Sequence, residues 1–479
     1  MLTERALAGL REATHRDRVL TAREDLLTYG ADATPFVSGT PQAVVIPRDV
    51  EELVDIVLLA NEEGFALVPR GAGTGLSGGA APTEGGVVLL FPSWNRILEI
   101  DEENMTAWVE PGVVTADLHR AVEARGLFYP PDPGSMRVCT IGGNVAENAG
   151  GLRGLKYGVT KDWVEGLDVV LPTGEPVRFG GKAMKDVAGY NLVDLMVGSE
   201  GTLGIFTRVL VRLVALPAAT RTLTATFGSI AAAGEAVAAI GAERIVPCTL
   251  EILDGVTLEA IERFARLGLP TDAAAMLLIE VDGHARVVEE EADAVARVCR
   301  AAGALTVQRA DDEAKADDLR TARRAAFTAL ARLKPTVILE DATVPRSAVP
   351  AMLERIRAIA ERHGVLIGVF GHAGDGNLHP TCLLDARVPG ELARAEAAFE
   401  EIFGAALSLG GTITGEHGVG VAKKRFLERQ VGEPAIRFMR IVKNALDPNH
   451  VLNPGKLFDP RPRCEHPPLD HPRLAGTLP

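Results

Sequence analysis

The sequence has few cysteines, no long apolar run and a deficit of positive charge, and each shortage excludes a class of protein. Five cysteines are spread along the chain with no Cys-x-x-Cys pair, which argues against a disulfide scaffold and against iron–sulfur ligation: Cys139, Cys248, Cys299, Cys382 and Cys464. No apolar run is long enough to cross a bilayer. Acidic residues outnumber basic ones by 64 to 50, and the net charge of -14 disfavours nucleic acid as a partner.

The composition is otherwise that of an ordinary globular protein. A length of 479 residues exceeds what one hydrophobic core usually holds, so two or three domains are expected. Met1 to Asp25 mixes charged residues with Leu and Ala, which predicts an amphipathic helix and not a signal peptide. We therefore expect a cytoplasmic enzyme without a transmembrane segment.

The first motif is the glycine-rich segment 70–79, which follows a predicted strand at 65–69. Glycines this dense indicate close approach of the backbone to a ligand. Gly73, Gly75 and Gly78 match the spacing GxGxxG, but a nicotinamide-binding Rossmann fold requires a helix at this point. The chain continues instead into a predicted strand at 87–91, so the segment indicates a phosphate-binding loop of another kind.

Two further glycine zones follow, at 130–158 and 198–205. The longer zone alternates prolines, glycines and amides, a composition typical of a surface that presents backbone N–H groups to an extended ligand. Each zone alone could be a set of tight turns. Three such zones beside β-rich sequence favour one long cofactor, such as a dinucleotide.

A second kind of motif lies further along the chain. His372 and His379 flank a Gly-Asp-Gly sequence that predicts a tight reversal, so both imidazoles can converge on one point. With Glu416 they form a ligand set suited to zinc, manganese or iron, and His417 is left as a base beside the metal. Asp375 and Asn377 are either supports of this metal site or parts of the turn, and we interpret His363 and His450 as structural.

Between these motifs the pattern changes at Leu216. Helices are predicted at 230–240, 257–267, 285–302 and 349–363, with strands at 276–281 and 306–308. This alternation indicates an α+β layer with an antiparallel sheet, which we interpret as a substrate domain.

The motifs resemble those of a known family. Residues 69–75, 140–144 and 198–204 resemble the FAD-binding domain of the vanillyl-alcohol oxidase superfamily. Residues 372–380 and 415–420 resemble the C-terminal domain of the FAD-linked D-2-hydroxy-acid dehydrogenases, and the whole chain is most similar to the glycolate oxidase branch of that family.

The resemblance implies the fold class and the domain organisation. The fold would be α+β, with an FAD-binding domain of the vanillyl-alcohol oxidase and p-cresol methylhydroxylase type and an α+β FAD-linked oxidase C-terminal, or cap, domain. The expected segments are a helical N-terminus at 1–40, the FAD domain at 41–215, the cap with the metal loops at 216–430, and 431–479 returning to the FAD domain. We expect the end of this last segment to be loosely ordered.

The resemblance also implies the cofactor. Thr74 stands near the place where some members carry a covalent flavin histidine, so the FAD is expected to be non-covalent. The residues expected to bind it are Arg70, Gly71, Ala72, Gly73, Thr74, Gly75, Ser77, Pro131, Gly134, Ser135, Thr140, Gly142, Gly143, Asn144, Asn148, Gly151, Gly158, Glu200, Gly201, Ile205 and Asn453.

The reaction implied is oxidation of a 2-hydroxy acid, glycolate or D-lactate first, to the 2-oxo acid by hydride transfer to flavin. The metal of His372, His379 and Glu416 would bind the substrate, His417 would be the base, and Arg323 aligns with the arginine that binds the substrate carboxylate. A lysine found in some relatives is absent from 338–341, which favours a monocarboxylic substrate. Possible partners are an iron–sulfur subunit and a second flavin-type subunit. Through them the chain could associate peripherally with a membrane.

Several alternatives remain open. D-2-hydroxyglutarate or another D-2-hydroxy acid could be the substrate. A reductase resembling UDP-N-acetylenolpyruvylglucosamine reductase would share the FAD fold but would not need the metal motifs. A metal-dependent hydrolase would leave the glycine zones unexplained, and a non-catalytic subunit would not need the histidines and Glu416.

Overall fold

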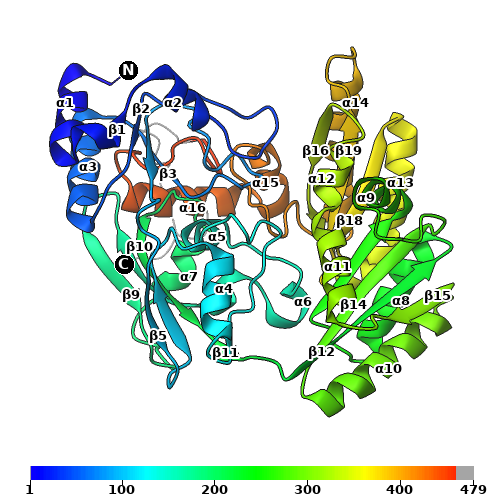
Figure 1. Cartoon of the computed structure of the whole chain (residues 1–479). Coiled ribbons are helices and arrows are strands. Elements are labelled where there is room, and N and C mark those ends of the chain that lie inside the picture. Colours follow the sequence, from blue (N-terminus) through cyan, green and yellow to red (C-terminus); the bar gives the residue numbers. More distant parts are fainter. Residues whose placement is uncertain (1, 460–479) are drawn as a thin grey trace, which may run out of the picture.

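The computed structural model describes residues 2–459, so Cys464 and the proline-rich end of the chain lie outside the described residues. The chain forms two bodies that lie side by side (Figure 1). The first body contains the N-terminal half and the last helices, and the second is built around one large sheet formed by the middle of the chain.

The first body begins with a small sheet whose strand order is β1-β2-β4-β3. Strands β2, β4 and β3 are parallel, and β1 joins β2 in antiparallel orientation. Helix α3 connects β2 to β3, with Asp49 accepting a hydrogen bond from the N–H of Glu52 at its start and left-handed Gly64 at its end. The elements are α1 (Glu4–Ala13), β1 (Val19–Leu20), α2 (Arg23–Thr28), β2 (Ala43–Val45), α3 (Val50–Glu63), β3 (Leu67–Arg70) and β4 (Val87–Leu90), with a 3-10 turn at Arg16–Arg18.

The single helix expected through Asp25 is wrong. Helix α1 ends at Ala13 because Thr14 leaves the helical conformation and returns its hydroxyl to the carbonyl of Leu10. After the 3-10 turn at Arg16–Arg18, strand β1 pairs with β2, so the N-terminal segment completes the edge of the small sheet.

A second, antiparallel sheet has the order β5-β6-β10-β8-β9. Its strands are β5 (Ile97–Asp101), β6 (Thr106–Val109), β8 (Val164–Val170), β9 (Pro176–Gly180) and β10 (Ile205–Arg212), and β7 (Leu127–Phe128) pairs separately with β11 (Val214–Ala215). The helices beside it are α4 (Thr115–Glu123), α5 (Ile141–Glu147), α6 (Gly154–Tyr157) and α7 (Leu192–Met196), with a 3-10 turn at Thr160–Trp163. Helix α5 was not predicted within the second glycine zone: Gly142 and Gly143 lie in its first turn, which the Thr140 side chain caps.

The second body is an antiparallel sheet of eight strands in the order β15-β12-β14-β13-β18-β19-β16, with β17 paired to β19. Its strands are β12 (Ala219–Phe227), β13 (Thr249–Asp254), β14 (Ala275–Gly283), β15 (Thr306–Arg309), β16 (Thr336–Leu339), β17 (Ala342–Thr343), β18 (Leu366–His372) and β19 (Asn377–Leu384). Its helices are α8 (Ile230–Ala242), α9 (Gly255–Ala265), α10 (Ala285–Ala301), α11 (Glu313–Arg324), α12 (Ala326–Leu330), α13 (Val349–His363) and α14 (Glu391–Ser408), with a 3-10 turn at Arg346–Ala348. The expected α+β layer with an antiparallel sheet is confirmed.

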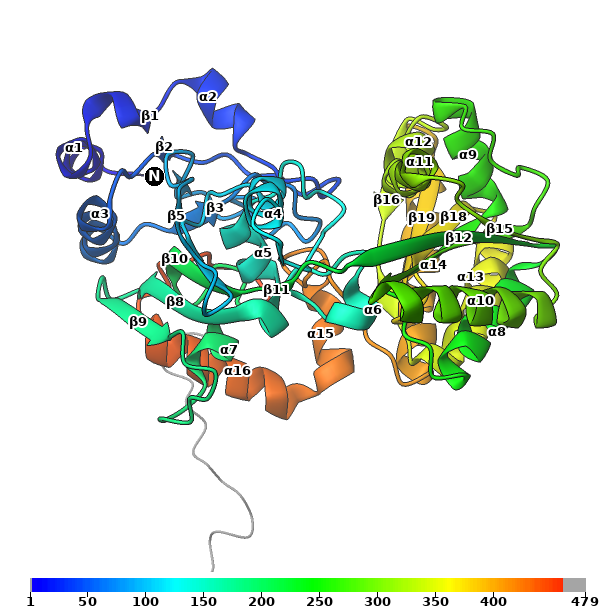
Figure 2. The ribbon, with the colours of Figure 1, turned by 60° about the horizontal axis from the view of Figure 1, so that its bottom comes forward.

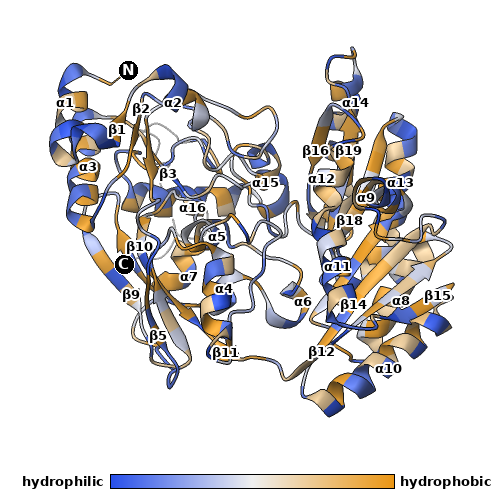
Figure 3. Ribbon diagram, viewed as in Figure 1, coloured by the Kyte–Doolittle hydropathy of each residue, from blue (hydrophilic) through white to orange (hydrophobic). Residues whose placement is uncertain are grey.

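Helices cover both faces of this sheet. Leu277 and Ile279 of β14 pack with α8, α10, α13 and α14, whereas Met276 and Leu278 pack with α9, α11 and α12. Successive side chains of a strand point to opposite faces, so a sheet covered on both sides needs continuous apolar strands. Figure 3 shows these strands as mostly hydrophobic and the helices as mixed.

The chain then returns to the first body through α15 (Lys424–Val431) and α16 (Glu433–Leu446), which lie beside it (Figure 2). Leu452 forms a bridge with Leu67 of β3, and the buried Lys443 ammonium donates to the carbonyls of Thr202 and Leu452. Within residues 2–459, no helix is both long and apolar enough to span a membrane.

Candidate active site

A cavity of about 940 Å³ lies between the two bodies. Fifteen of the residues expected to bind the cofactor line it: Arg70, Gly71, Ala72, Gly73, Thr74, Gly75, Gly134, Ser135, Thr140, Gly142, Gly143, Asn144, Glu200, Gly201 and Ile205. The second body contributes Arg323, His372, His379, Glu416 and His417 to the same cavity. The structure therefore brings the glycine zones and the histidine motifs together.

Six residues from the expected cofactor set lie outside this lining: Ser77, Pro131, Asn148, Gly151, Gly158 and Asn453. Several of them fix the loops that form the wall. The Asn453 amide donates to the carbonyls of Gly79 and Glu200 at 2.9 and 2.8 Å. The Ser77 carbonyl accepts the N–H groups of Val421 and Ala422, and the Asn148 side chain accepts that of Lys161.

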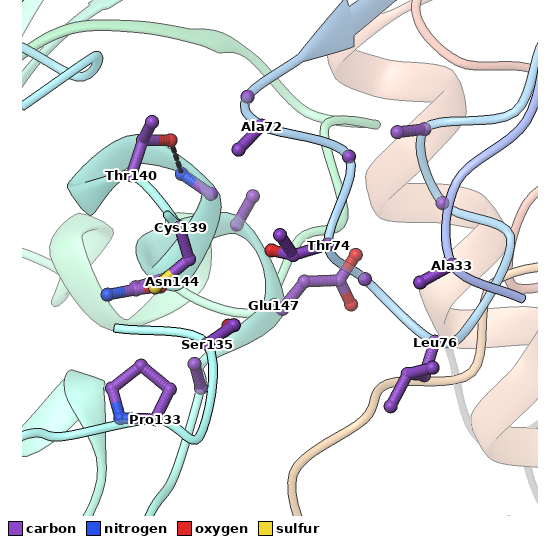
Figure 4. A pocket seen from close by; sticks show the side chains of 18 of the residues that line it. Ala33, Ala72, Thr74, Leu76, Pro133, Ser135, Cys139, Thr140, Asn144 and Glu147 are labelled. Carbon is purple, nitrogen blue, oxygen red and sulfur yellow. Dashed lines mark hydrogen bonds between the residues drawn. The ribbon is translucent and has the colours of Figure 1, made fainter. Parts of the chain in front are cut away.

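The wall formed by the first body is shaped by missing side chains. A Cβ at Gly73, which has a φ of 71°, would clash with the Arg70 guanidinium, and one at Gly71 would clash with the Thr140 hydroxyl. Figure 4 shows this region, with Thr140 at the start of α5 and its bond to the Gly143 N–H. Glycine-rich backbone and the first turn of α5 in the wall of the cavity fit an extended, phosphate-bearing ligand.

The predicted loop around His372 is a β-hairpin. His372 is the last residue of β18, His379 lies in β19 opposite Phe370, and only the four residues 373–376 form the turn. Gly371 and Gly376 have positive φ values of 154° and 85°, which allow the backbone to make this tight turn. The strands bring the two imidazole rings to a centroid distance of 5.1 Å, nearly perpendicular to each other.

Glu416 completes a three-residue centre. Its Oε1 atom lies 3.2 Å from Nε2 of His372 and 3.2 Å from Nε2 of His379, and the potential ligand atoms are all within 4.8 Å of one another. Burial opposes a charge on His372, but the carboxylates of Glu251 and Glu416 raise its pKa well above the usual value. Two imidazole nitrogens and a carboxylate in negatively charged surroundings fit a divalent ion such as zinc, manganese or iron.

His417 lies beside this centre, and its ring is parallel to that of His379. Its ring stacks on that of His379 at 5.2 Å, and its Nε2 lies 3.8 Å from Glu416 Oε1. Burial lowers the pKa of His417 to about 4, although Asp341 opposes this shift. A neutral imidazole that lines the cavity can accept a proton.

Asp341 organises the loop that carries Glu416 and His417, and sequence reasoning missed this role. Its carboxylate accepts the N–H groups of Gly415 and Glu416 at 2.7 and 2.9 Å and forms a buried ion pair with Lys423. Burial alone would raise the pKa of Asp341, but Lys423 and His417 lower it. Asn377, expected to serve either the metal site or the turn, donates to Thr343 and to Asp341 and so ties the hairpin to the same carboxylate.

Arg323 is buried at the edge of the centre. Its Nε donates to Glu251 at 2.5 Å, and its guanidinium lies 4.8 Å from the centre of the Phe370 ring. Its Nη2 has no hydrogen-bond partner among residues 2–459. The free nitrogen makes Arg323 suitable for binding an anionic group in the cavity.

Glu251, in the middle of β13, connects Arg323 to the histidine centre and was not predicted. One carboxylate oxygen accepts from Arg323 and the other bonds to Nδ1 of His372 at 2.6 Å. This contact fixes the ring so that Nε2 points to Glu416. Burial raises the pKa of Glu251, but Arg323 and His372 outweigh this effect and lower it.

The overall fold matches solved structures closely. A substrate-bound p-cresol methylhydroxylase superimposes with a TM-score of 0.80 at 19% identity, covering 96% of this chain and 98% of that chain. The 4-ethylphenol oxidase of Gulosibacter chungangensis gives a TM-score of 0.76 at 22% identity, covering 96% and 97%. The chain therefore has the two-domain fold of p-cresol methylhydroxylase and 4-ethylphenol oxidase.

Family models and relatives identify the branch. The model of the FAD binding domain matches residues 41–180, and that of the C-terminal domain of FAD linked oxidases matches residues 216–457. The glycolate oxidase subunit GlcD of Bacillus subtilis (strain 168) is 55% identical over 90% of this chain and 92% of its own length. The D-lactate dehydrogenase of Anaerostipes hadrus is 36% identical over 88% and 90%. The chain belongs to the family of FAD-linked oxidases.

Proposed function

We propose that the chain oxidises a small 2-hydroxy acid, with glycolate or D-lactate as the first candidates, to the 2-oxo acid by transferring a hydride to FAD. The observation that carries this proposal is the shared cavity, in which glycine loops for a dinucleotide face Arg323 and the His372, His379 and Glu416 centre. Relatives named glycolate oxidase subunit and D-lactate dehydrogenase support the substrate class.

The cofactor would lie along the wall of the first body. Bound FAD supplies the hydride acceptor. Thr74 lines the cavity and has no nucleophilic ring nitrogen, which supports non-covalent binding. The purified protein should be yellow and release FAD on acid denaturation, and a folded, colourless preparation unable to take up FAD would contradict this assignment.

His372, His379 and Glu416 would hold the divalent ion. Such an ion supplies Lewis acidity, which favours loss of the substrate's hydroxyl proton. His417 would accept that proton on Nε2, the nitrogen opposite the one near Asp341. Arg323 would bind the substrate carboxylate through its unpartnered Nη2 and so fix which hydrogen of the α-carbon faces the flavin.

A monocarboxylic substrate is supported by Leu339. This apolar residue lines the cavity, and Phe327 and Phe370 line it nearby. The next residue, Glu340, stands just before Asp341, at the place where some relatives carry a lysine. No second cation stands at that position to bind a distal carboxylate. Leu339→Lys should increase flavin reduction by D-2-hydroxyglutarate relative to glycolate, and an unchanged ratio would contradict this role of Leu339.

We also propose that the chain works with partner subunits. The Bacillus subtilis relative is named as a subunit of glycolate oxidase. The four described cysteines are buried and dispersed, so an iron–sulfur protein that accepts electrons would have to supply its own ligands. Isolation from the native host should yield a stoichiometric complex that contains iron and acid-labile sulfide. A chain isolated alone, with full activity towards its natural acceptor, would contradict the proposal.

One experiment tests the core of the proposal. The FAD-loaded chain is mixed anaerobically with glycolate, D-lactate, L-lactate or D-2-hydroxyglutarate, with and without a chelator, and loss of the oxidised flavin absorbance is followed. We expect rapid bleaching by glycolate or D-lactate that chelation abolishes and that zinc, manganese or iron restores. Bleaching by none of the four acids would overturn the assignment.

A further inference from the structure

Glu147 occupies a position between three segments that meet at the cavity. It is the last residue of α5 and lines the cavity beside Thr74 and Gly75. Its carboxyl group points towards the loop that carries Thr74 (Figure 4). A Cβ added at Gly79 or at Gly418 would clash with its oxygen atoms, so the glycine loop and the 415–420 loop both close around this carboxyl group.

The hydrogen-bond partners of Glu147 differ from those of its acidic neighbours. Glu200 accepts the N–H groups of Val419 and Gly420 at 2.8 and 2.6 Å, and Asp32 accepts that of Thr34 at 2.9 Å. Within residues 2–459, the only hydrogen-bond partner of the Glu147 side chain is the Ser77 hydroxyl, at the long distances of 3.4 and 3.5 Å. Backbone N–H groups stabilise the charges of Glu200 and Asp32, whereas Glu147 receives no such support.

The acidic groups around Glu147 oppose its ionisation, and one ammonium favours it. Glu200 and Asp32 face it with like charge, whereas the opposing cation, Lys456, is directed to the Ala81 carbonyl and the Thr83 hydroxyl. Burial, followed by Glu200 and Asp32, raises the pKa of Glu147 well above its usual value. The geometry and the charges therefore both favour the protonated form.

We propose that Glu147 is held as a neutral carboxylic acid at the wall of the cofactor cavity, and that its proton sets the reduction potential of the bound flavin by keeping a third negative charge away from it. A flavin that accepts a hydride gains one negative charge. An ionised Glu147 beside Glu200 and Asp32 would oppose that charge in a site of low dielectric constant. Glu147 would therefore act on the flavin through its charge and not through contact with the substrate. This inference rests on the proposed binding of FAD.

The reduction potential of the bound flavin tests the proposal. It is measured against pH for the FAD-loaded chain and for Glu147→Gln, which keeps the shape but cannot ionise. We expect equal potentials at neutral pH and, above the pKa of Glu147, a wild-type potential that falls below that of the variant. Identical curves at all pH values, or a higher potential of the variant already at neutral pH, would overturn the proposal.

A matched control removes a carboxylate elsewhere. Glu103 is exposed in the turn between β5 and β6 of the same body, and Glu103→Gln should leave the pH dependence of the potential as in the wild type. The same shift in Glu103→Gln as in Glu147→Gln would show a general charge effect and contradict a specific role of Glu147.

Infrared spectroscopy of the FAD-free chain separates this inference from the proposed function. At neutral pH the difference spectrum of wild type minus Glu147→Gln should contain the carbonyl band of a protonated carboxylic acid, which shifts in deuterium oxide. Absence of this band overturns the neutral Glu147 even if FAD binds. Its presence in a chain that fails to bind FAD would overturn the proposed cofactor and leave the protonation state established.

Discussion

The two walls of the cavity are built by different means. The first body contributes mainly backbone, with glycines that allow close approach and the capped first turn of α5 at its edge. The second body contributes side chains that are held by buried carboxylates, Glu251 on one side and Asp341 on the other. The first wall is suited to holding a long ligand, and the second to acting on a small one.

This difference predicts how each wall responds to substitution. Backbone contacts are spread over many residues, so the loss of one side chain should weaken cofactor binding little. The histidine centre depends on three proposed metal ligands, His372, His379 and Glu416, and on the carboxylates of Glu251 and Asp341 that hold them in place. Single changes in the second body should therefore abolish chemistry while leaving the flavin bound.

The largest effect is expected for His379→Ala. This variant removes one of three proposed metal ligands, and loss of Lewis acidity should lower turnover by about 1000-fold or more. Elemental analysis should find less metal, and the visible spectrum should show unchanged flavin content. Loss of flavin together with the metal would contradict the division of labour between the two walls.

A second histidine of the same body provides the control. His363 ends α13 and bonds to Glu401 at 2.9 Å on the surface. His363→Ala should keep both metal and turnover. If it lost metal as His379→Ala does, the effect would come from general destabilisation of the second body.

His417→Asn should have the next largest effect. The asparagine keeps polarity and approximate size but removes the proposed base, which should slow flavin reduction by substrate about 100-fold to 10,000-fold. Stopped-flow mixing under anaerobic conditions measures this step directly. Metal content should remain as in the wild type, and an unchanged rate of reduction would exclude the role as base.

Glu251→Gln tests the support behind the centre. The amide can no longer neutralise Arg323 or hold His372 in place with full strength, so metal affinity should fall about 10-fold to 100-fold. Glu280→Gln is the matched control, because Glu280 accepts from Arg320 at 2.9 Å in the same sheet but does not line the cavity. Both variants should lower the melting temperature, and only Glu251→Gln should lower metal affinity. Equal metal affinities in the two would remove Glu251 from the centre.

The contrast also explains which features could be read from the sequence. The glycine loop, β18 and the paired histidines are local patterns, in which residues close in sequence act together. Glu251 is different, because its partners Arg323 and His372 lie 72 and 121 positions away. Asp341 bonds to residues 74 and 75 positions further on. Such pairings depend on strand order in the large sheet, which no local pattern specifies.

Helix α5 is a local element that was not predicted. Gly142 and Gly143 are poor helix formers, so the sequence around them gives no helix signal. The Thr140 cap and the burial of Ile141 and Val145 in the core of the first body outweigh that preference. Tertiary packing therefore decided the conformation at this point.

The smallest effect is expected at Glu200, where the first body holds a carboxylate without a lysine partner. Burial raises the pKa of Glu200 to about 6, although the N–H groups of Val419 and Gly420 lower it. The corresponding carboxylate of the second body, Asp341, is paired with Lys423 and has a lowered pKa. A raised carboxyl pKa stabilises the fold below the unfolded value of 4.5, and this contribution is lost as the pH rises through 6.

Glu200→Gln should therefore change the pH dependence of stability more than stability itself. Between pH 4.5 and 7.5, the free energy of unfolding of the wild type should fall relative to that of the variant by about 2 kcal/mol, which corresponds to the difference between a folded pKa of about 6 and the usual 4.5. Urea unfolding at several pH values, with Glu103→Gln as the control for a lost surface charge, measures this difference. A wild-type curve that rises relative to Glu200→Gln over this range would reverse the sign and place Glu200 with Asp341 as a carboxylate stabilised in its charged form.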